Sequence, residues 1–426
     1  MSLEFNKLIY QVQKMGAMLD ALDFDFSDKL QIALERFANA GDLDAVRERI
    51  EIVRSAEVSG YRGAAPLDAP YGQPINLIYP PPPVPEQATL LAADGSQIYV
   101  DEQAPMHYYV LNIGLFIYHQ GVEHTPEQIS LPQLVYHKDY VHDKSGRVIN
   151  NRTVDARRTV REMENLAEYC WKMSRAGMAQ PIVALYDNHL LFWANTDVTG
   201  SDHILRDYHS AMIQLHDSGA LLAGYVDHPF RSRVVTRLLY LLSLKDEAEI
   251  IARQKVLAEG GDLEGLRDVH LFDVILEPGE RSAIMVQNSP RNLDYRQRGV
   301  SYEIAFFYVK VANAFQTTIA RIDIPMWVAR DPSAVDTIHG LILQQCEMQG
   351  RTPYPYALTR ADELAVITSK DKAKLDELVQ IELRKKGISP KGSSAKDQSK
   401  HVARSSKRFY ELRTEMRSSL LRHPRG

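Results

Sequence analysis

Two short apolar runs that each end at an aspartate constrain the fold of this chain most. Residues 89–93 (TLLAA) precede Asp94 and a Gly-Ser pair, and residues 181–186 (PIVALY) precede Asp187 and an asparagine. A short apolar run bounded by turn-forming residues is typical of a strand that is buried on both faces. If the two strands are neighbours, their aspartates lie together at one edge of a β-sheet.

Two carboxylates at one edge of a sheet indicate a metal site. Like charges at short distance repel each other, and a divalent cation between them removes the repulsion. Proteins hold Mg²⁺ or Mn²⁺ against a phosphodiester in this way. The alternative for each aspartate is a structural role, because Asp before Gly or Asn often only caps a turn.

The composition is that of an ordinary globular protein. The chain has 426 residues, of which 45% are hydrophobic and 25% are charged, so it exceeds one typical domain. Its two cysteines, Cys170 and Cys346, lie in apolar segments, which excludes a cysteine-ligated zinc site and suits a reducing cytoplasm. The chain has no apolar run near the roughly 20 residues of a membrane span and no Gly-x-x-x-x-Gly-Lys-Ser/Thr loop for ATP hydrolysis. We therefore expect a cytoplasmic protein without a membrane partner.

The charge is distributed unevenly along the chain. The net charge is −5, but residues 384–426 carry 13 Lys and Arg against 3 Asp and Glu, a balance of +10 that leaves −15 for the remainder. A basic tail on an acidic body indicates contact with nucleic acid or an acidic partner. The alternative is a solvated tail without a partner.

Helical and strand-like patterns divide the chain into four parts. We expect an N-terminal helical region over residues 1–60, a proline-rich linker over 61–88, a core domain over 89–385 and a basic, disordered tail over 386–426. In the core, strand-like runs cover residues 90–94, 108–118, 123–135, 181–187, 221–226, 283–287, 304–311 and 318–324, and helical patterns cover 153–178, 207–218, 232–243, 334–348 and 371–385. Strands that first follow one another and then alternate with helices predict an α/β fold, with a mixed sheet flanked by helices as in an RNase H-like core.

Four short motifs follow one another along the core. They are Ala-Asp-Gly-Ser at 93–96, Gly-Tyr-Val-Asp at 224–227, Phe-Phe-Tyr at 306–308 and Tyr-Pro-Tyr-Ala-Leu-Thr-Arg-Ala-Asp-Glu at 354–363. In this order they resemble the motifs of the NurA nucleases. The resemblance implies an RNase H-like fold and a manganese-dependent enzyme that resects DNA ends beside the hexameric translocase HerA.

The resemblance also implies the residues of the site. Asp94 would be the first metal ligand and Asp187 the second carboxylate carried by a strand. The helix between them would supply a glutamate, for which Glu162 fits best and Glu164 is the rival. The alternative is that these glutamates only belong to a solvated face of the helix. Tyr354 matches a tyrosine of the family near the site, with a packing anchor as the alternative.

Two positions depart from the family pattern. The family usually has histidine eight residues after the tyrosine, where this chain has Asp362. Aspartate can still ligate Mn²⁺, but it donates a proton less readily at neutral pH. Asp187 is followed by Asn188 and His189, where Gly-Ser is typical of the family.

The resemblance therefore predicts a metal-dependent DNA nuclease with Mn²⁺ or Mg²⁺ as cofactor. It implies 5′–3′ exonuclease and single-strand endonuclease activity in end resection and double-strand break repair, by a homodimer that works with a HerA-type ATPase. Candidates for phosphate contacts are Arg231, Arg233, Arg351 and Arg360, and candidates for base stacking are Tyr225 and Phe230. A non-catalytic RNase H-like protein that binds DNA or scaffolds a complex is the alternative, and a nuclease acting on RNA also stays open.

Overall fold

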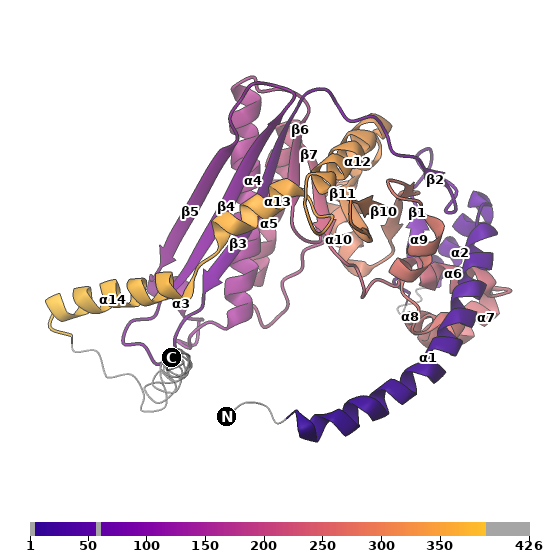
Figure 1. Ribbon diagram of the computed structural model, residues 1–426, viewed down its shortest axis with the longest axis horizontal. Helices are drawn as coiled ribbons and strands as arrows, with labels where there is room; N and C mark the ends of the chain where they lie inside the picture. The colour runs from indigo at the N-terminus through magenta and orange to yellow at the C-terminus, as the bar shows by residue number, and fades with distance from the viewer. Residues whose placement is uncertain (1–4, 57–60, 389–426) are drawn as a thin grey trace, which may run out of the picture.

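A computed structural model describes residues 5–56 and 61–388, which form a mixed sheet covered by helices on both faces (Figure 1). The strands are β1 (Ala64–Pro66), β2 (Ile78–Tyr79), β3 (Ala88–Ile98), β4 (Tyr109–Gln120), β5 (Glu127–Val135), β6 (Ile182–Tyr186), β7 (Leu221–Val226), β8 (Arg281–Ser282), β9 (Met285–Gln287), β10 (Ile304–Ala312) and β11 (Thr317–Pro325). Their order in the sheet is β1-β9-β10-β11-β7-β6-β3-β4-β5, while β8 pairs with β10 and with β2.

The helices fill the connections between these strands. They are α1 (Asn6–Ala38), α2 (Leu43–Ser55), α3 (Lys138–Val141), α4 (Asn151–Arg175), α5 (Ser201–Asp217), α6 (Val234–Ser243), α7 (Glu247–Ala252), α8 (Gln254–Glu259), α9 (Asp268–Ile275), α10 (Pro290–Arg298), α11 (Met326–Ala329), α12 (Pro332–Glu347), α13 (Tyr356–Ala365) and α14 (Ser369–Lys385). No helix in the described ranges is both long and apolar enough to cross a membrane.

The five strands β5-β4-β3-β6-β7 form an RNase H-like core. Strands β3, β4 and β5 are an antiparallel meander, whereas β6 and β7 continue the sheet parallel to β3. The parallel steps need crossover connections, which α4 and α5 provide. The expected α/β fold with a mixed sheet flanked by helices is therefore confirmed.

Alternate residues of β3 pack against different helical layers. Leu91 and Ala93 lie in an apolar cluster with residues of α4 and α5, whereas Leu90 and Ala92 share a cluster with residues of α12 and α13. Successive side chains of a strand point to opposite faces, so the apolar run in β3 covers both faces of the sheet. Figure 1 shows α13 crossing the sheet on the face opposite to α4.

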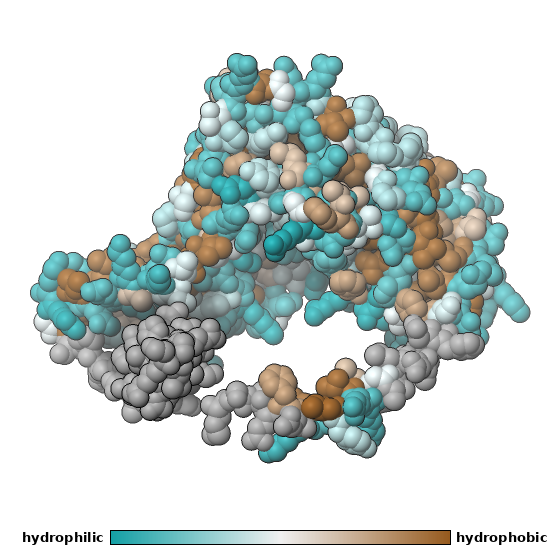
Figure 2. All heavy atoms as spheres, viewed as in Figure 1, coloured by the Kyte–Doolittle hydropathy of each residue, from teal (hydrophilic) through white to brown (hydrophobic). Residues whose placement is uncertain are grey.

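The N-terminal region is helical, as predicted. The break near Gly41 separates α1 from α2, and the Asp42 carboxylate caps α2 by accepting hydrogen bonds from the backbone N–H groups of Asp44 and Ala45. The end of α1 joins the core, where the rings of Phe37 and Phe272 meet edge to face at 5.8 Å. The first turns of α1 extend away from the body and expose apolar side chains (Figures 1 and 2).

The segment expected to be a linker contains sheet strands. Within residues 61–88, β1 pairs with β9 and β2 pairs with β8, while the proline run at 80–85 stays irregular. The partner strands are about 200 residues further along the chain, so no local pattern signals the pairing. The division into four parts otherwise stays a prediction, and the basic tail lies outside the described residues from 389 onward.

Helix α13 sits unusually close to β4 because residue 114 is a glycine. A Cβ atom there would lie 2.2 Å from the Ala361 carbonyl oxygen and 2.6 Å from the Ala365 backbone nitrogen. The Asn112 amide also donates to the Ala365 carbonyl at 2.9 Å, and the Ser96 hydroxyl donates to the same oxygen. These contacts fix the helix directly over β3 and β4.

We expect Gly114→Ala to destabilise the fold because its methyl group meets backbone atoms that cannot move independently. Overpacking of this kind reduces the free energy of unfolding by about 1–3 kcal/mol or more. Urea unfolding measures the change, with Gly350→Ala as the control, since no described atom lies within 4 Å of a Cβ at that position. Equal unfolding midpoints for the two variants would show that α13 is not held by this contact.

Candidate functional site

Asp94 and Asp187 lie side by side, although only Asp187 follows the end of its strand. The expectation that Asp94 ends a strand is wrong, because β3 continues to Ile98 and only its pairing with β6 stops before Asp94. Strands β3 and β6 are parallel, with Ala93 opposite Tyr186, so the next residues, Asp94 and Asp187, are neighbours across the sheet. The negative charge of Asp187 reaches Asp94 and contributes to raising the pKa of the Asp94 carboxyl. The structure thus brings together the two residues from which the sequence argument began.

Helix α4 adds Glu162 to this edge. A Cβ atom at Gly95 would lie 2.5 Å from Glu162 Oε1, so the glycine after Asp94 allows the glutamate to approach the strand. The Glu162 side chain is buried, and its Oε1 lies 3.4 Å from Arg158 Nε. Arg158 in turn donates from Nη1 to the Gly95 carbonyl at 2.7 Å. A half-buried cation, that of Arg158, therefore lies beside the glutamate and β3.

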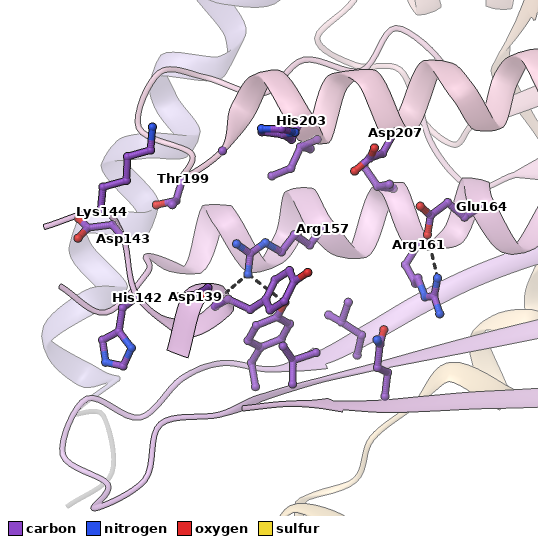
Figure 3. Close-up of a pocket in the computed structure, with 18 residues that line it drawn as sticks. Asp139, His142, Asp143, Lys144, Arg157, Arg161, Glu164, Thr199, His203 and Asp207 are labelled. Carbon is purple, nitrogen blue, oxygen red and sulfur yellow. Dashed lines mark hydrogen bonds and ion pairs between the residues drawn. The ribbon is translucent and has the colours of Figure 1, made fainter. Parts of the chain in front are cut away.

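The rival Glu164 lies on another side of α4. Its carboxylate accepts a hydrogen bond from Arg161 at 2.9 Å and lines a cavity of about 730 Å³ between α4, α5 and strands β4 and β5. Figure 3 shows this cavity, with Arg157, His203 and Asp207 on its walls. Asp94 and Asp187 do not line this cavity. Glu162, rather than Glu164, is therefore the glutamate near these two aspartates.

The C-terminal motif supplies two more groups. Asp362, on α13, interacts with Asp94 through its charge and a hydrogen bond between the two carboxyl groups. Tyr354 precedes α13, interacts with Asp187 by a hydrogen bond and packs edge to face on the Tyr225 ring at 5.3 Å. Burial and the charge of Asp187 raise the pKa of Tyr354, so its hydroxyl stays protonated and can donate to that carboxylate.

Sequence reasoning missed two residues of the cluster. Asp227 follows β7, which is parallel to β6, and its charge acts on Asp187 and Tyr354. The signal was present, because the run 221–226 also ends at an aspartate. Arg158 had no local signal, since one arginine on a charged helix resembles any solvated residue.

Burial makes these carboxyl groups hard to ionise. It raises the pKa of Asp94 to about 6, with further increases from Asp187 and Asp362, although the Gly95 N–H donates to Asp94. It raises the pKa of Glu162 to about 8, against the opposing charge of Arg158. Burial likewise raises the pKa of Asp187 and of Asp227. The site concentrates negative groups that repel one another when ionised.

The donor set of this cluster fits a divalent cation. Carboxylate oxygens are the ligands that Mg²⁺ and Mn²⁺ prefer. Glu162 Oε1 and Asp227 Oδ1 are buried and have no hydrogen-bond partner among the described residues. In the described ranges, no three His, Cys, Asp or Glu side chains already surround one ion position. Binding of an ion therefore needs side-chain rotation at these carboxylates.

The aromatic candidates for base stacking separate clearly. Tyr225 is fully buried and cannot stack on a base, whereas Phe230 is exposed and stacks on the His228 ring at 5.3 Å. Among the candidate arginines, Arg360 pairs with Glu363, and Arg233 donates to a backbone carbonyl. Of Tyr225, Phe230, Arg233 and Arg360, only Phe230 presents an exposed ring on which a ligand could stack.

The stability of the metal-free protein should fall as pH rises. Because the pKa of Glu162 is about 8 in the folded state against an ordinary value of 4.5, the folded state binds more protons between these pH values. We expect Glu162→Gln to flatten this dependence and to gain a few kcal/mol near pH 8. Urea unfolding in EDTA across this range tests it, with Glu164→Gln as the control. An unchanged slope in Glu162→Gln would contradict it.

Three of the solved structures that match this chain have low identity to it. The crystal structure of the NurA nuclease from Sulfolobus solfataricus matches with a TM-score of 0.44 and 13% identity, over 89% of this chain and 98% of that one. A NurA structure bound to dAMP and manganese matches with a TM-score of 0.35 and 12% identity, over 87% and 96%. Human endonuclease V matches with a TM-score of 0.27 and 12% identity, over 73% and 93%. No relative was found among the curated proteins.

A family model covers more than half of the sequence. The model of the NurA domain matches residues 88–367, a range that runs from the start of β3 to just beyond α13. It therefore includes all four sequence motifs and every carboxylate of the cluster. The chain belongs to the NurA family.

Proposed function

We propose that this protein is a metal-dependent nuclease that hydrolyses phosphodiester bonds of DNA. The observation that carries the proposal is the cluster of Asp94, Asp187, Glu162 and Asp362, whose charges meet from β3, the end of β6, α4 and α13, with Glu162 itself buried. Similar structures bear the names NurA nuclease and NurA bound to dAMP and manganese, which supports a nucleotide substrate and a Mn²⁺ or Mg²⁺ cofactor.

The carboxylates would hold the cation and the surrounding groups would orient them. Asp94, Asp187, Glu162 and Asp362 are the proposed ligands. A bound divalent cation supplies Lewis-acid stabilisation of the charge that develops on the phosphoryl group. Tyr354 donates to the Asp187 carboxylate and restricts its rotation. Arg158 reduces the repulsion felt by Glu162 and ties α4 to β3.

Aspartate at position 362 changes how protons are handled in the site. A histidine there could gain or lose a proton near neutral pH, whereas an aspartate adds negative charge. Asp362 acts on Asp94 both through its charge and through a hydrogen bond, and both effects raise the pKa of Asp94. In our proposal Asp362 is a metal ligand, and a water molecule rather than this side chain transfers the proton.

The finer parts of the proposal rest on the family resemblance. They are 5′–3′ exonuclease and single-strand endonuclease activity, a role in end resection and double-strand break repair, a homodimeric cytoplasmic enzyme, and a HerA-type ATPase as motor. Two free, buried cysteines suit a reducing compartment. A non-catalytic DNA-binding protein is the competing function, because Asp362 departs from the family pattern.

We expect Asp94→Ala to abolish cleavage and leave the fold intact. Even residues that only orient metal ligands contribute 10–100-fold to activity, so loss of a ligand should reduce the rate by more than about 100-fold. The measurement is cleavage of labelled single- and double-stranded DNA with Mn²⁺, with Mg²⁺ and with EDTA. Single- and double-stranded RNA serve as the competing substrates.

A matched pair on α4 controls this experiment. Glu162→Gln should lose activity like Asp94→Ala, whereas Glu164→Gln should retain it, because Glu164 faces the cavity of Figure 3. Cleavage by Asp94→Ala at the wild-type rate would exclude the cluster as the active site. DNA binding without cleavage by the wild-type protein, with or without an added ATPase, would favour the non-catalytic alternative.

Metal binding should be visible without activity. We expect Mn²⁺ at about 100 times its dissociation constant to stabilise the wild-type protein by about 2.7 kcal/mol, and to stabilise Asp187→Ala much less. The effect should be larger near pH 8 than near pH 6, because ligation displaces protons from carboxyls with raised pKa values. Thermal unfolding with Mn²⁺ or EDTA measures it. An unfolding temperature that Mn²⁺ leaves unchanged in the wild-type protein would contradict the metal site.

A further inference from the structure

A second pocket adjoins the loop that follows Asp187. It has a volume of about 360 Å³ and lies between that loop, the residues before β1 and the start of α10. Its walls include Arg62, His189, Trp193, Arg291 and Arg321. We call this the arginine pocket.

Positive charge prevails in the arginine pocket. Three arginines line it against one acidic residue, Asp294. Arg321 is neutralised by the buried Asp323, whose carboxylate lies 2.7 Å from Arg321 Nε. Arg62 and Arg291 have no ion pair within the described ranges, and burial and the charge of Arg62 lower the pKa of Arg291. Two unpaired guanidinium groups that repel each other define a place where an anion is stabilised.

An exposed aromatic ring stands beside these charges. The Arg291 guanidinium lies over the Trp193 ring at 5.1 Å from its centroid, and Trp193 is 38% exposed. Aromatic faces that remain open next to basic side chains are how proteins bind the bases and backbone of single strands. The pair of groups therefore suits a ligand with both a phosphate and a planar base.

The pocket is close to the carboxylate cluster along the chain. His189 lines it and is two residues from Asp187, so their Cα atoms are at most about 7.6 Å apart. The His189 ring is held by Asp323, with Nδ1 3.0 Å from the carboxylate, which fixes the loop at this point. Helix α10 also begins at the pocket, and the N-terminus of a helix favours an anion.

We infer that the arginine pocket binds a phosphate group of the DNA strand next to the bond that is cut, with the adjoining base on Trp193. Arg62 and Arg291 would contact the phosphate oxygens. The inference rests on the proposed nuclease function, since it assigns the path of the strand away from the carboxylates. The phosphate can be the terminal one at a 5′ end or an internal one, and the two sources share the same chemistry.

Binding to the full-length Asp94→Ala protein tests the pocket without cleavage. The probe is a short single-stranded DNA labelled at its 3′ end, prepared with either a 5′-phosphate or a 5′-hydroxyl, and its affinity is measured by fluorescence anisotropy at several salt concentrations. We expect Arg62→Ala and Arg291→Ala each to weaken binding about tenfold and to reduce the salt slope by about 0.7. Trp193→Ala should weaken binding about tenfold with the slope unchanged.

Arg298→Ala is the matched control. Arg298 is exposed on the same helix, α10, but does not line the pocket, so its removal should leave binding within about twofold. Asp294→Asn should tighten binding, because it removes the one acidic residue of the wall. Thermal unfolding of each variant confirms that these exposed substitutions leave the fold intact.

The outcomes separate the two sources and the two proposals. A loss confined to the 5′-phosphorylated probe supports a pocket for the strand end, and an equal loss on both probes supports a pocket for an internal phosphate. Binding by Arg62→Ala and Arg291→Ala equal to that of Arg298→Ala overturns the inference. If the wild-type protein fails to cleave DNA but these arginines still govern binding, the nuclease proposal fails and the pocket stands.

Discussion

The parallel pairing of β3 with β6 is the interaction on which the site depends. Its register sets Ala93 against Tyr186 and so places Asp94 and Asp187 beside each other. After the β3-β4-β5 meander, the chain crosses over through α4 and adds β6 beside β3. The pairing of β6 with β7 repeats the geometry one strand further and adds Asp227. Three carboxylates thus gather where the parallel pairing of β3, β6 and β7 stops.

The close packing of two helices on the sheet then adds two more carboxylates to the cluster, although the carboxylates repel one another. The glycines at 95 and 114 let α4 and α13 approach the sheet, and these helices carry Glu162 and Asp362. Burial raises the pKa of Asp94, Glu162, Asp187 and Asp227, and carboxyls with raised pKa values gathered in this way are typical of functional sites. Arg158 relieves part of the repulsion felt by Glu162, and a divalent cation would relieve the remainder.

Much of the fold could be predicted from the sequence, because the local pattern of many segments agrees with the element that each segment forms. The run 90–93 is apolar throughout since β3 is covered on both faces, and the helical period in 153–178 matches α4. The sequence did not predict β1 and β2 within residues 61–88, because these strands pair with strands far along the chain. The sequence left the choice between Glu162 and Glu164 open. Both lie on the same helix, and which neighbours each of them faces depends on how that helix packs.

The sequence by itself determined the alternation of strands and helices, the aspartates that follow the apolar runs, and the family. Each of these is encoded within a few adjacent residues, through periodicity, turn formers or short motifs. Only the tertiary structure decided that Glu162 joins the cluster, that Arg158 balances it and that Asp227 belongs to it. It alone also assembled the arginine pocket, from Arg62, Arg291 and the loop carrying Trp193. Such neighbours are set by strand order and helix packing, which act between residues far apart in the chain.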